Sequence, residues 1–93
     1  MKSLKLKASA DDLSLAVLVS EPEGSPKGVF QIVHGMCEHK ERYVPFMEYL
    51  SAHGYVCVIH DHRGHGESVK TPDDLGFMYK GGWRAMVEDV RVV

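Results

Sequence analysis

The stretch that decides the fold is YVCVIHDHRGHGES, residues 55–68. Its first five residues are apolar without alternation, a pattern typical of a strand that is covered on both faces. The polar residues that follow include two glycines, Gly64 and Gly66, and they predict a tight loop at the carboxyl end of that strand. In this loop Asp61 can accept backbone N–H groups, and Arg63 offers five donors in a rigid fork. We expect both side chains to brace the loop without contacting a substrate.

A second apolar run that ends in a polar loop occurs upstream. The apolar run Val29–Val33 ends at the loop HGMCEH, residues 34–39. Between the two runs, apolar side chains recur at the spacing of one helical stripe: Tyr43, Phe46, Met47 and Leu50. Strand, helix and strand predict a βαβ unit with parallel strands and a right-handed crossover.

The residues on either side of this unit predict a hairpin and a second helix. Residues 4–9 alternate apolar and polar side chains, and Leu13–Val19 form a second strand after a polar turn, which indicates a β-hairpin. A second helix begins near Trp83 and has one apolar face: Trp83, Met86, Val87 and Val90. The predicted class is α/β: a β-hairpin, then a βαβ unit, then the start of a further helix that is still in progress at Val93.

Length and composition are those of one small globular domain. The chain has 93 residues and a formal net charge of −2, so no basic surface for nucleic acid is expected. No apolar run approaches the roughly 18–20 residues of a membrane span, and the first residues lack the apolar core of a secretory signal. Because two cysteines cannot form a disulfide framework, we expect a cytoplasmic protein.

The two loops lie where an α/β sheet binds its ligands. In open sheets of this class, ligands bind outside the carboxyl ends of the strands, and both parallel strands deliver a loop there. We expect Gly35 to adopt a positive φ, which turns the chain sharply and points the amide of Met36 outward. An exposed N–H at a strand end is what an oxyanion hole requires.

A strand that ends in HGxxEH (residues 34–39), followed by Arg42, Tyr43 and a helix, and a strand that ends in DHRGHGES (residues 61–68) resemble the α/β-hydrolase superfamily. Within it, the sequence is similar to the monoacylglycerol lipase and lysophospholipase branch. The resemblance implies that residues 1–93 are the amino-terminal portion of a single α/β-hydrolase domain. It also implies a serine hydrolase that cleaves carboxylic esters, lipid-like (monoacylglycerol or lysophospholipid) or small acyl, through an acyl-enzyme and with no cofactor or metal.

The resemblance assigns roles residue by residue. The backbone N–H of Met36 becomes an oxyanion-hole donor, and its neighbours shape the loop and the pocket: His34, Gly35, Cys37, Glu38 and His39. Arg42 and Tyr43 lead into the first helix and support the pocket floor. The second loop is given its shape by a further set: Asp61, Arg63, Gly64, Gly66 and Ser68.

The catalytic triad of that superfamily has no match in the sequence. The nucleophile occupies a GxSxG turn, followed along the chain by the acid and then the histidine, and no GxSxG occurs here. Ser68 lies in GESVK, which lacks the second glycine. We therefore expect the nucleophile elbow, the acid, the histidine and the lid to be absent from residues 1–93, and these residues alone to be inactive.

Other functions remain open. His60, His62 and His65 have the HxHxxH spacing of a metal site, although Gly64 stands where the metallo-β-lactamase signature has aspartate. Cys37 is a possible nucleophile, but a pocket-lining role is the simpler interpretation because a reactive thiolate needs an oriented base. A third alternative is a non-catalytic interaction lobe.

The resemblance also implies a strand order. The fourth strand lies between the second and the third, which leaves Val29–Val33 at an edge of the sheet with free N–H and C=O groups. We expect the remainder of the hydrolase chain or a second copy to cover that edge. Without such cover, the chain is not expected to be a well-behaved monomer.

Overall fold

The computed structural model describes residues 1–36, 38–79 and 81–93. The strands are β1 (Lys2–Lys7), β2 (Ser14–Ser20), β3 (Gly28–Ile32) and β4 (Tyr55–His60). The helices are α1 (Val44–Ala52) and α2 (Gly82–Val92), with two 3₁₀ turns, η1 (Lys40–Tyr43) and η2 (Pro72–Asp74).

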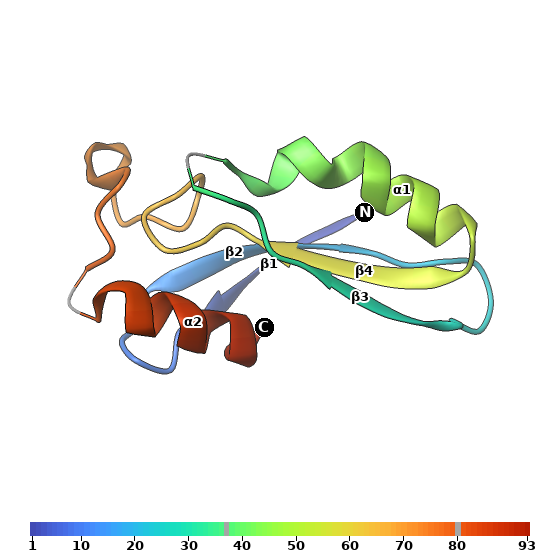
Figure 1. Ribbon diagram of the computed structural model, residues 1–93, viewed down its shortest axis with the longest axis horizontal. Coiled ribbons are helices and arrows are strands. Elements are labelled where there is room, and N and C mark those ends of the chain that lie inside the picture. The colour runs from blue at the N-terminus through green and yellow to red at the C-terminus, as the bar shows by residue number, and fades with distance from the viewer. Residues whose placement is uncertain (37, 80) are drawn as a thin grey trace.

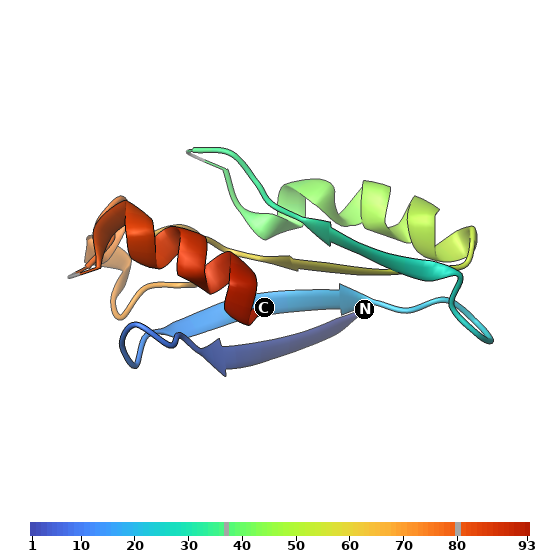
Figure 2. The same ribbon diagram turned by 60° about the horizontal axis from the view of Figure 1, so that its bottom comes forward.

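The four strands form one mixed sheet in the order β1-β2-β4-β3. β1 and β2 form an antiparallel hairpin, in which Leu4 lies opposite Val17. β4 runs antiparallel to β2 and parallel to β3, with Val56 opposite Val29. The predicted α/β class, the hairpin, the βαβ unit and the strand order are therefore confirmed, and β3 lies at the edge of the sheet (Figure 2).

The two α-helices lie on opposite sides of the sheet (Figure 1). The main core joins α1 to β2 and β4 and consists of buried apolar side chains: Leu18, Met47, Leu50, Cys57 and Ile59. A second cluster joins the hairpin to later parts of the chain, with Tyr79 and Val93 packed against Ala8, Leu13 and Leu15. Full burial of a Leu or Ile side chain stabilises a fold by roughly 1.5–3 kcal/mol, so these clusters hold the strand ends in place.

The helices bury faces that differ from the predicted ones. In α1 the predicted stripe is right for Met47, which is fully buried, but wrong for Phe46, which is 50% exposed. In α2 the predicted apolar face is only partly covered: Trp83 and Val87 are 63% and 58% exposed, whereas Met86 and Val90 are half-buried. The helix turns Asp89 inward instead, because that carboxylate is the partner of the buried Arg63.

β4 is better covered than β3, but only one of its faces carries fully buried apolar side chains. Cys57 and Ile59 lie on that face and are completely buried, whereas Val56 and Val58 on the other face are half-buried. In contrast, Val29 and Phe30 of β3 are 69% and 42% exposed, and Val33 just after it is 48% exposed. The expectation of cover on both faces is thus wrong for β3, the edge strand, and only partly right for β4 within the described residues.

Helix length is modest throughout. α1 has 9 residues and α2 has 11. Within the described ranges, no helix is both long enough and apolar enough to cross a membrane.

Candidate active site

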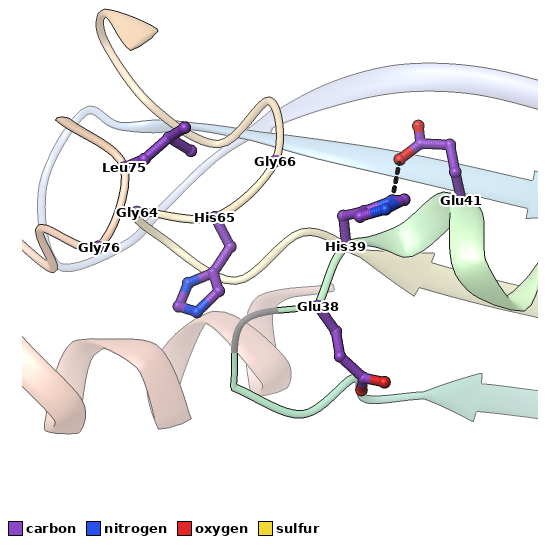
Figure 3. A pocket seen from close by; sticks show the side chains of 8 residues that line it. All are labelled: Glu38, His39, Glu41, Gly64, His65, Gly66, Leu75 and Gly76. Atoms are coloured by element: carbon purple, nitrogen blue, oxygen red, sulfur yellow. Dashed lines mark hydrogen bonds and ion pairs between the residues drawn. The ribbon is translucent and has the colours of Figure 1, made fainter. Parts of the chain in front are cut away.

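A cavity of about 520 Å³ opens beside the loops that follow β3 and β4 (Figure 3). Three segments line it. Glu38, His39 and Glu41 come from the loop after β3 and from η1, Gly64–Gly66 come from the loop after β4, and Leu75 and Gly76 follow η2. The structure therefore brings the two sequence-predicted loops together around one cavity, at the carboxyl ends of two parallel strands.

Glu38 closes the turn after β3. Its Oε1 accepts hydrogen bonds from the Gly35 backbone N–H at 2.6 Å and from the Tyr43 hydroxyl at 2.9 Å. Its Oε2 lies 3.0 Å from Arg42 Nε. The bond from the Gly35 amide and the bond from Tyr43 hold the pKa of Glu38 below its ordinary value. The predicted HGxxEHxxRY run is thus a local network around one ionised carboxylate.

The expected positive φ at Gly35 is wrong. The glycines in the left-handed region among the described residues lie elsewhere, and Gly35 is not one of them. What limits this position is space, because a Cβ here would lie 3.0 Å from Glu38 Oε1. The turn is therefore shaped by the Glu38 carboxylate rather than by a backbone conformation that only glycine adopts.

Met36, the candidate oxyanion donor, lies within this turn, between Gly35 and Glu38. Its side chain is 65% exposed, and its amide forms no hydrogen bond with another residue that the structure describes. Cys37, predicted to line the pocket, lies outside the described residues.

A reciprocal pair of histidines joins the two loops. The His62 backbone N–H donates to His34 Nε2 at 2.9 Å, and His62 Nε2 donates to the His34 carbonyl, also at 2.9 Å. Because His34 Nε2 accepts, its Nδ1 carries the proton that it donates to the Gly35 carbonyl at 2.7 Å. Burial lowers the pKa of His62. The two imidazoles thus connect the loop after β3 to the loop after β4 through hydrogen bonds to backbone groups.

His60 and His65, the other two histidines whose spacing suggested a metal site, are not arranged as metal ligands. His60 is 1% exposed, and neither of its ring nitrogens has a partner among the described residues. Burial is the main reason that the pKa of His60 falls to about 4, and the nearby His62 and His34 lower it further. His65 Nδ1 lies 3.1 Å from the Arg63 carbonyl. In the part of the chain that the structure describes, no three His, Cys, Asp or Glu side chains are grouped so that they could hold a metal ion.

Asp61 is fully buried and holds the start of the second loop. Its Oδ1 accepts the Lys40 backbone N–H at 2.7 Å, and its Oδ2 accepts the Glu67 backbone N–H at 2.9 Å. Burial alone would raise the pKa of Asp61, but the bonds from Glu67 and Lys40 outweigh it and hold the pKa below its ordinary value. Ser68 Oγ donates to the Asp61 carbonyl at 2.7 Å and accepts the Ala16 N–H at 2.9 Å. Both ends of the loop are thereby joined to each other and to β2.

Two glycines make this loop possible. Gly64 has a φ of +75°, and a Cβ there would lie 2.3 Å from the Phe77 carbonyl oxygen. Gly66 has a φ of +49°, and a Cβ there would lie 2.4 Å from the Asp61 carboxylate. Any larger residue would therefore clash with backbone at Gly64 and with a buried charge at Gly66.

Arg63 points away from the cavity and ties the loop to the rest of the fold. Its side chain is completely buried, with Nε 2.7 Å from Asp89 Oδ2 and Nη2 2.9 Å from Asp89 Oδ1. Its Nη1 lies 2.9 Å from Asp11 Oδ2 in the hairpin turn. The hydrogen bonds to Asp89 raise the pKa of Arg63, so the guanidinium stays charged in the interior.

Lys40 has a structural role that the sequence did not predict. This lysine is 1% exposed, and its ammonium contacts three carboxylates: Asp61 at 2.8 Å, Glu41 at 2.8 Å and Glu67 at 2.7 Å. Burial alone would lower the pKa of Lys40, but these three partners raise it above its ordinary value. The one signal in the sequence is that the two loops carry more carboxylates than cations.

Sheet order, loop placement and cavity define the class of this protein as an α/β-hydrolase fold. A family model described as serine aminopeptidase, S33, matches residues 24–93, and the chain therefore belongs to that family of α/β hydrolases. A thermostable carboxyl esterase from Bacillus coagulans, solved in complex with glycerol, superimposes with a TM-score of 0.87 at 26% identity; the match covers 98% of this chain and 29% of that one.

Curated relatives include two lipases. The chain is 40% identical over 47 residues to the monoacylglycerol lipase of Mycolicibacterium smegmatis, a match that covers 50% of this chain and 17% of the relative. It is 35% identical over 60 residues to the monoglyceride lipase of Homo sapiens, covering 64% of this chain and 20% of that relative. The chain thus corresponds to the amino-terminal portion of an α/β hydrolase and spans about a fifth of the length of these relatives.

Proposed function

We propose that this chain is the oxyanion-loop portion of a serine hydrolase that cleaves carboxylic esters. The observation that supports it most is the Glu38 network, which closes the turn that carries Met36, while Glu38 itself lines the cavity. In the tetrahedral intermediate, that amide donates to the developing oxyanion, a contact that contributes about 3–4 kcal/mol to lowering the barrier.

The chemistry proceeds through an acyl-enzyme on a serine that this chain does not contain. That serine attacks the ester carbonyl, the alcohol leaves, and water then hydrolyses the acyl-enzyme. The proposal places the nucleophile, the acid and the histidine outside residues 1–93, since the matches cover only 17% and 20% of the two lipases' length. The proposal uses no cofactor and no metal, and it places the protein in the cytoplasm.

The proposed substrates are lipid-like esters, such as monoacylglycerols or lysophospholipids, or esters of small acyl groups. Two relatives are monoglyceride lipases by name, and the similar solved structure is a carboxyl esterase. Leu75, which is 60% exposed, adds an apolar side chain to the cavity wall.

The test uses the complete hydrolase that carries this segment. We expect it to hydrolyse p-nitrophenyl esters and to be labelled by a fluorophosphonate probe that reacts with activated serines, and residues 1–93 alone to do neither. A complete protein that is inert in both assays contradicts the proposal. Esterase activity of residues 1–93 that is sensitive to the probe contradicts the assignment of the nucleophile to the missing region.

A further inference from the structure

Lys40 connects the two loops that line the cavity. Its backbone N–H donates to Asp61 Oδ1 at 2.7 Å, and its ammonium donates to Asp61 Oδ2 at 2.8 Å. The same ammonium reaches Glu67 Oε1 at 2.7 Å, in the loop after β4. Lys40 itself does not line the cavity. It therefore lies behind the cavity wall and binds one loop to the other from there.

The charges around the Lys40 ammonium explain why replacement of this residue should disturb both loops. Asp61 is fully buried, so its carboxylate needs a compensating cation, and the ammonium of Lys40 is 2.8 Å away. Glu67 and Glu41 are 66% and 48% exposed, and water screens their share of the attraction. The contact with Asp61 is the anchor, and the two glutamates orient the ammonium between the loops.

The neighbours of this network line the cavity. His39 and Glu41, on either side of Lys40, form one wall, and Gly66, next to Glu67, belongs to the opposite wall (Figure 3). Met36 lies four positions before Lys40 on the same loop. A change in the separation of Lys40 from Asp61 therefore moves the segment that carries the candidate oxyanion donor.

We propose that Lys40 is a positioning residue that fixes the oxyanion loop against the loop after β4. This inference rests on the proposed ester hydrolysis. Lys40 acts through the placement of the Met36 amide, not through contact with the substrate. Because the amide binds the oxyanion more strongly in the transition state than it binds the substrate, the loss of Lys40 lowers kcat more than it changes KM.

The test compares three variants of the complete hydrolase with p-nitrophenyl butyrate as the substrate. Lys40→Met removes the cation and keeps a similar volume, Lys40→Arg keeps the charge, and Lys2→Met removes an exposed ion pair with Glu21 as a matched control. Below the melting temperature of each variant, we expect Lys40→Met to lose about tenfold or more in kcat with little change in KM. Lys40→Arg should recover most of that loss, and Lys2→Met should match the parent protein. A folded Lys40→Met variant with the parent kcat overturns the proposal, as does a Lys40→Arg variant as impaired as Lys40→Met.

If Lys40→Met does not fold, the variant Glu67→Gln tests the proposal instead. It leaves the Lys40–Asp61 contact in place and removes one exposed partner, so the fold should be retained. We expect a loss of about threefold in kcat at an unchanged Tm, and a parent-like kcat overturns the proposal.

Amide hydrogen exchange separates this inference from the proposed function. Exchange of residues 35–41 and 61–68 should be faster in Glu67→Gln and in folded Lys40→Met than in the parent, whatever the enzyme's activity. If the parent protein does not hydrolyse esters, the proposed function fails, and exchange alone then decides whether Lys40 holds the loops together. Unchanged exchange in both loops overturns the inference.

Discussion

Arg63 and Asp89 form a two-point ion pair in the interior, with Nε 2.7 Å from Oδ2 and Nη2 2.9 Å from Oδ1, and both side chains are fully buried. The pair joins the loop after β4 to α2, two segments that are 26 residues apart. Removing Asp89 leaves the buried guanidinium with the partly exposed Asp11 as its remaining carboxylate partner, and the loss of one side of such a pair costs about 3–5 kcal/mol. The shape of the cavity wall therefore depends on a contact that lies well outside the cavity.

The first prediction follows from that pair. Asp89→Asn should destabilise the complete protein by about 3–5 kcal/mol, measured by urea unfolding, because Arg63 stays charged in the interior. Arg91→Gln is the matched control on the same helix, since it breaks an ion pair with Glu88 whose arginine is 77% exposed. We expect almost no change in the unfolding midpoint for Arg91→Gln. Equal effects of the two substitutions would contradict the structural role of the buried pair.

A pair of glycines tests the geometry of the second loop. Gly64 and Gly24 share a φ of +75°, but a Cβ at Gly64 would lie 2.3 Å from the Phe77 carbonyl, whereas Gly24 has nothing within 4 Å. Replacement by Ala costs roughly 1–2 kcal/mol at either position because of the left-handed conformation. Gly64→Ala must also displace backbone, so its loss of stability in urea unfolding should clearly exceed that of Gly24→Ala. Similar losses would mean that the backbone at Phe77 moves away at little cost in stability, which would contradict the steric role of Gly64.

Acid should destabilise the fold through His60. The pKa of this buried imidazole is about 4, against roughly 6.5 in the unfolded chain, so the unfolded state binds more protons between these values. Stability from this group is fully present above pH 6.5 and falls as the pH drops towards 4, by at most about 3 kcal/mol. We expect His60→Leu to flatten the dependence of unfolding free energy on pH in this range. Burial also lowers the pKa of His62, so some slope should remain; an unchanged slope would contradict the assignment.

Substitutions that add a side chain at Gly35 test the proposed role of the turn that carries Met36. A Cβ at this position would lie 3.0 Å from Glu38 Oε1, so Gly35→Ala should push the carboxylate off the Gly35 amide and re-aim Met36. The end of the Glu38 side chain can shift by a few tenths of an ångström, so we expect Gly35→Ala to lower kcat of the complete hydrolase modestly and the larger Gly35→Val to lower it by about tenfold. Glu38→Gln, which weakens the same hydrogen bonds without adding bulk, should lower kcat less than Gly35→Val. If Gly35→Val retains full activity, Met36 is not the donor.

The exposed edge of the sheet gives a prediction about the isolated segment. β3 is the edge strand, and Val29, Phe30 and Val33 are substantially exposed. Light scattering of residues 1–93 should therefore show association beyond a monomer, and Phe30→Lys should reduce it, because charge on an edge strand opposes pairing with another strand. A stable monomer at high concentration would contradict the proposal that further chain or a second copy covers this edge.

Local features of the sequence predicted the local parts of the fold. The apolar runs that became β3 and β4, the hairpin and the glycine-containing loop are each encoded within a few residues. The ion pairs of Lys40 and Arg63 were not predictable, because their partners Asp61 and Asp89 lie 21 and 26 residues away and come close only in the folded chain. From the local sequence alone, a lysine or an aspartate in a polar or amphipathic segment is expected to lie on the surface. Only the folded structure shows that these two are buried.

Two wrong expectations have the same origin. The pattern at Trp83 correctly predicted a helix with an apolar face, but periodicity does not say which face meets the sheet, and Asp89 decided that through Arg63. At Gly35 the sequence suggested a special backbone conformation, whereas the position is limited by the carboxylate of Glu38 three residues on. In both cases a charged side chain with a specific partner outweighed a rule based on residue type.

The most direct test of the account is a crystal structure of the complete hydrolase after reaction with a fluorophosphonate, whose phosphonyl oxygen takes the place of the oxyanion. We predict that the Met36 backbone nitrogen lies about 2.7–3.1 Å from that oxygen, with Glu38 still bound to the Gly35 amide. A phosphonyl oxygen bound by other donors, with the Met36 amide directed away from it, would contradict the central claim.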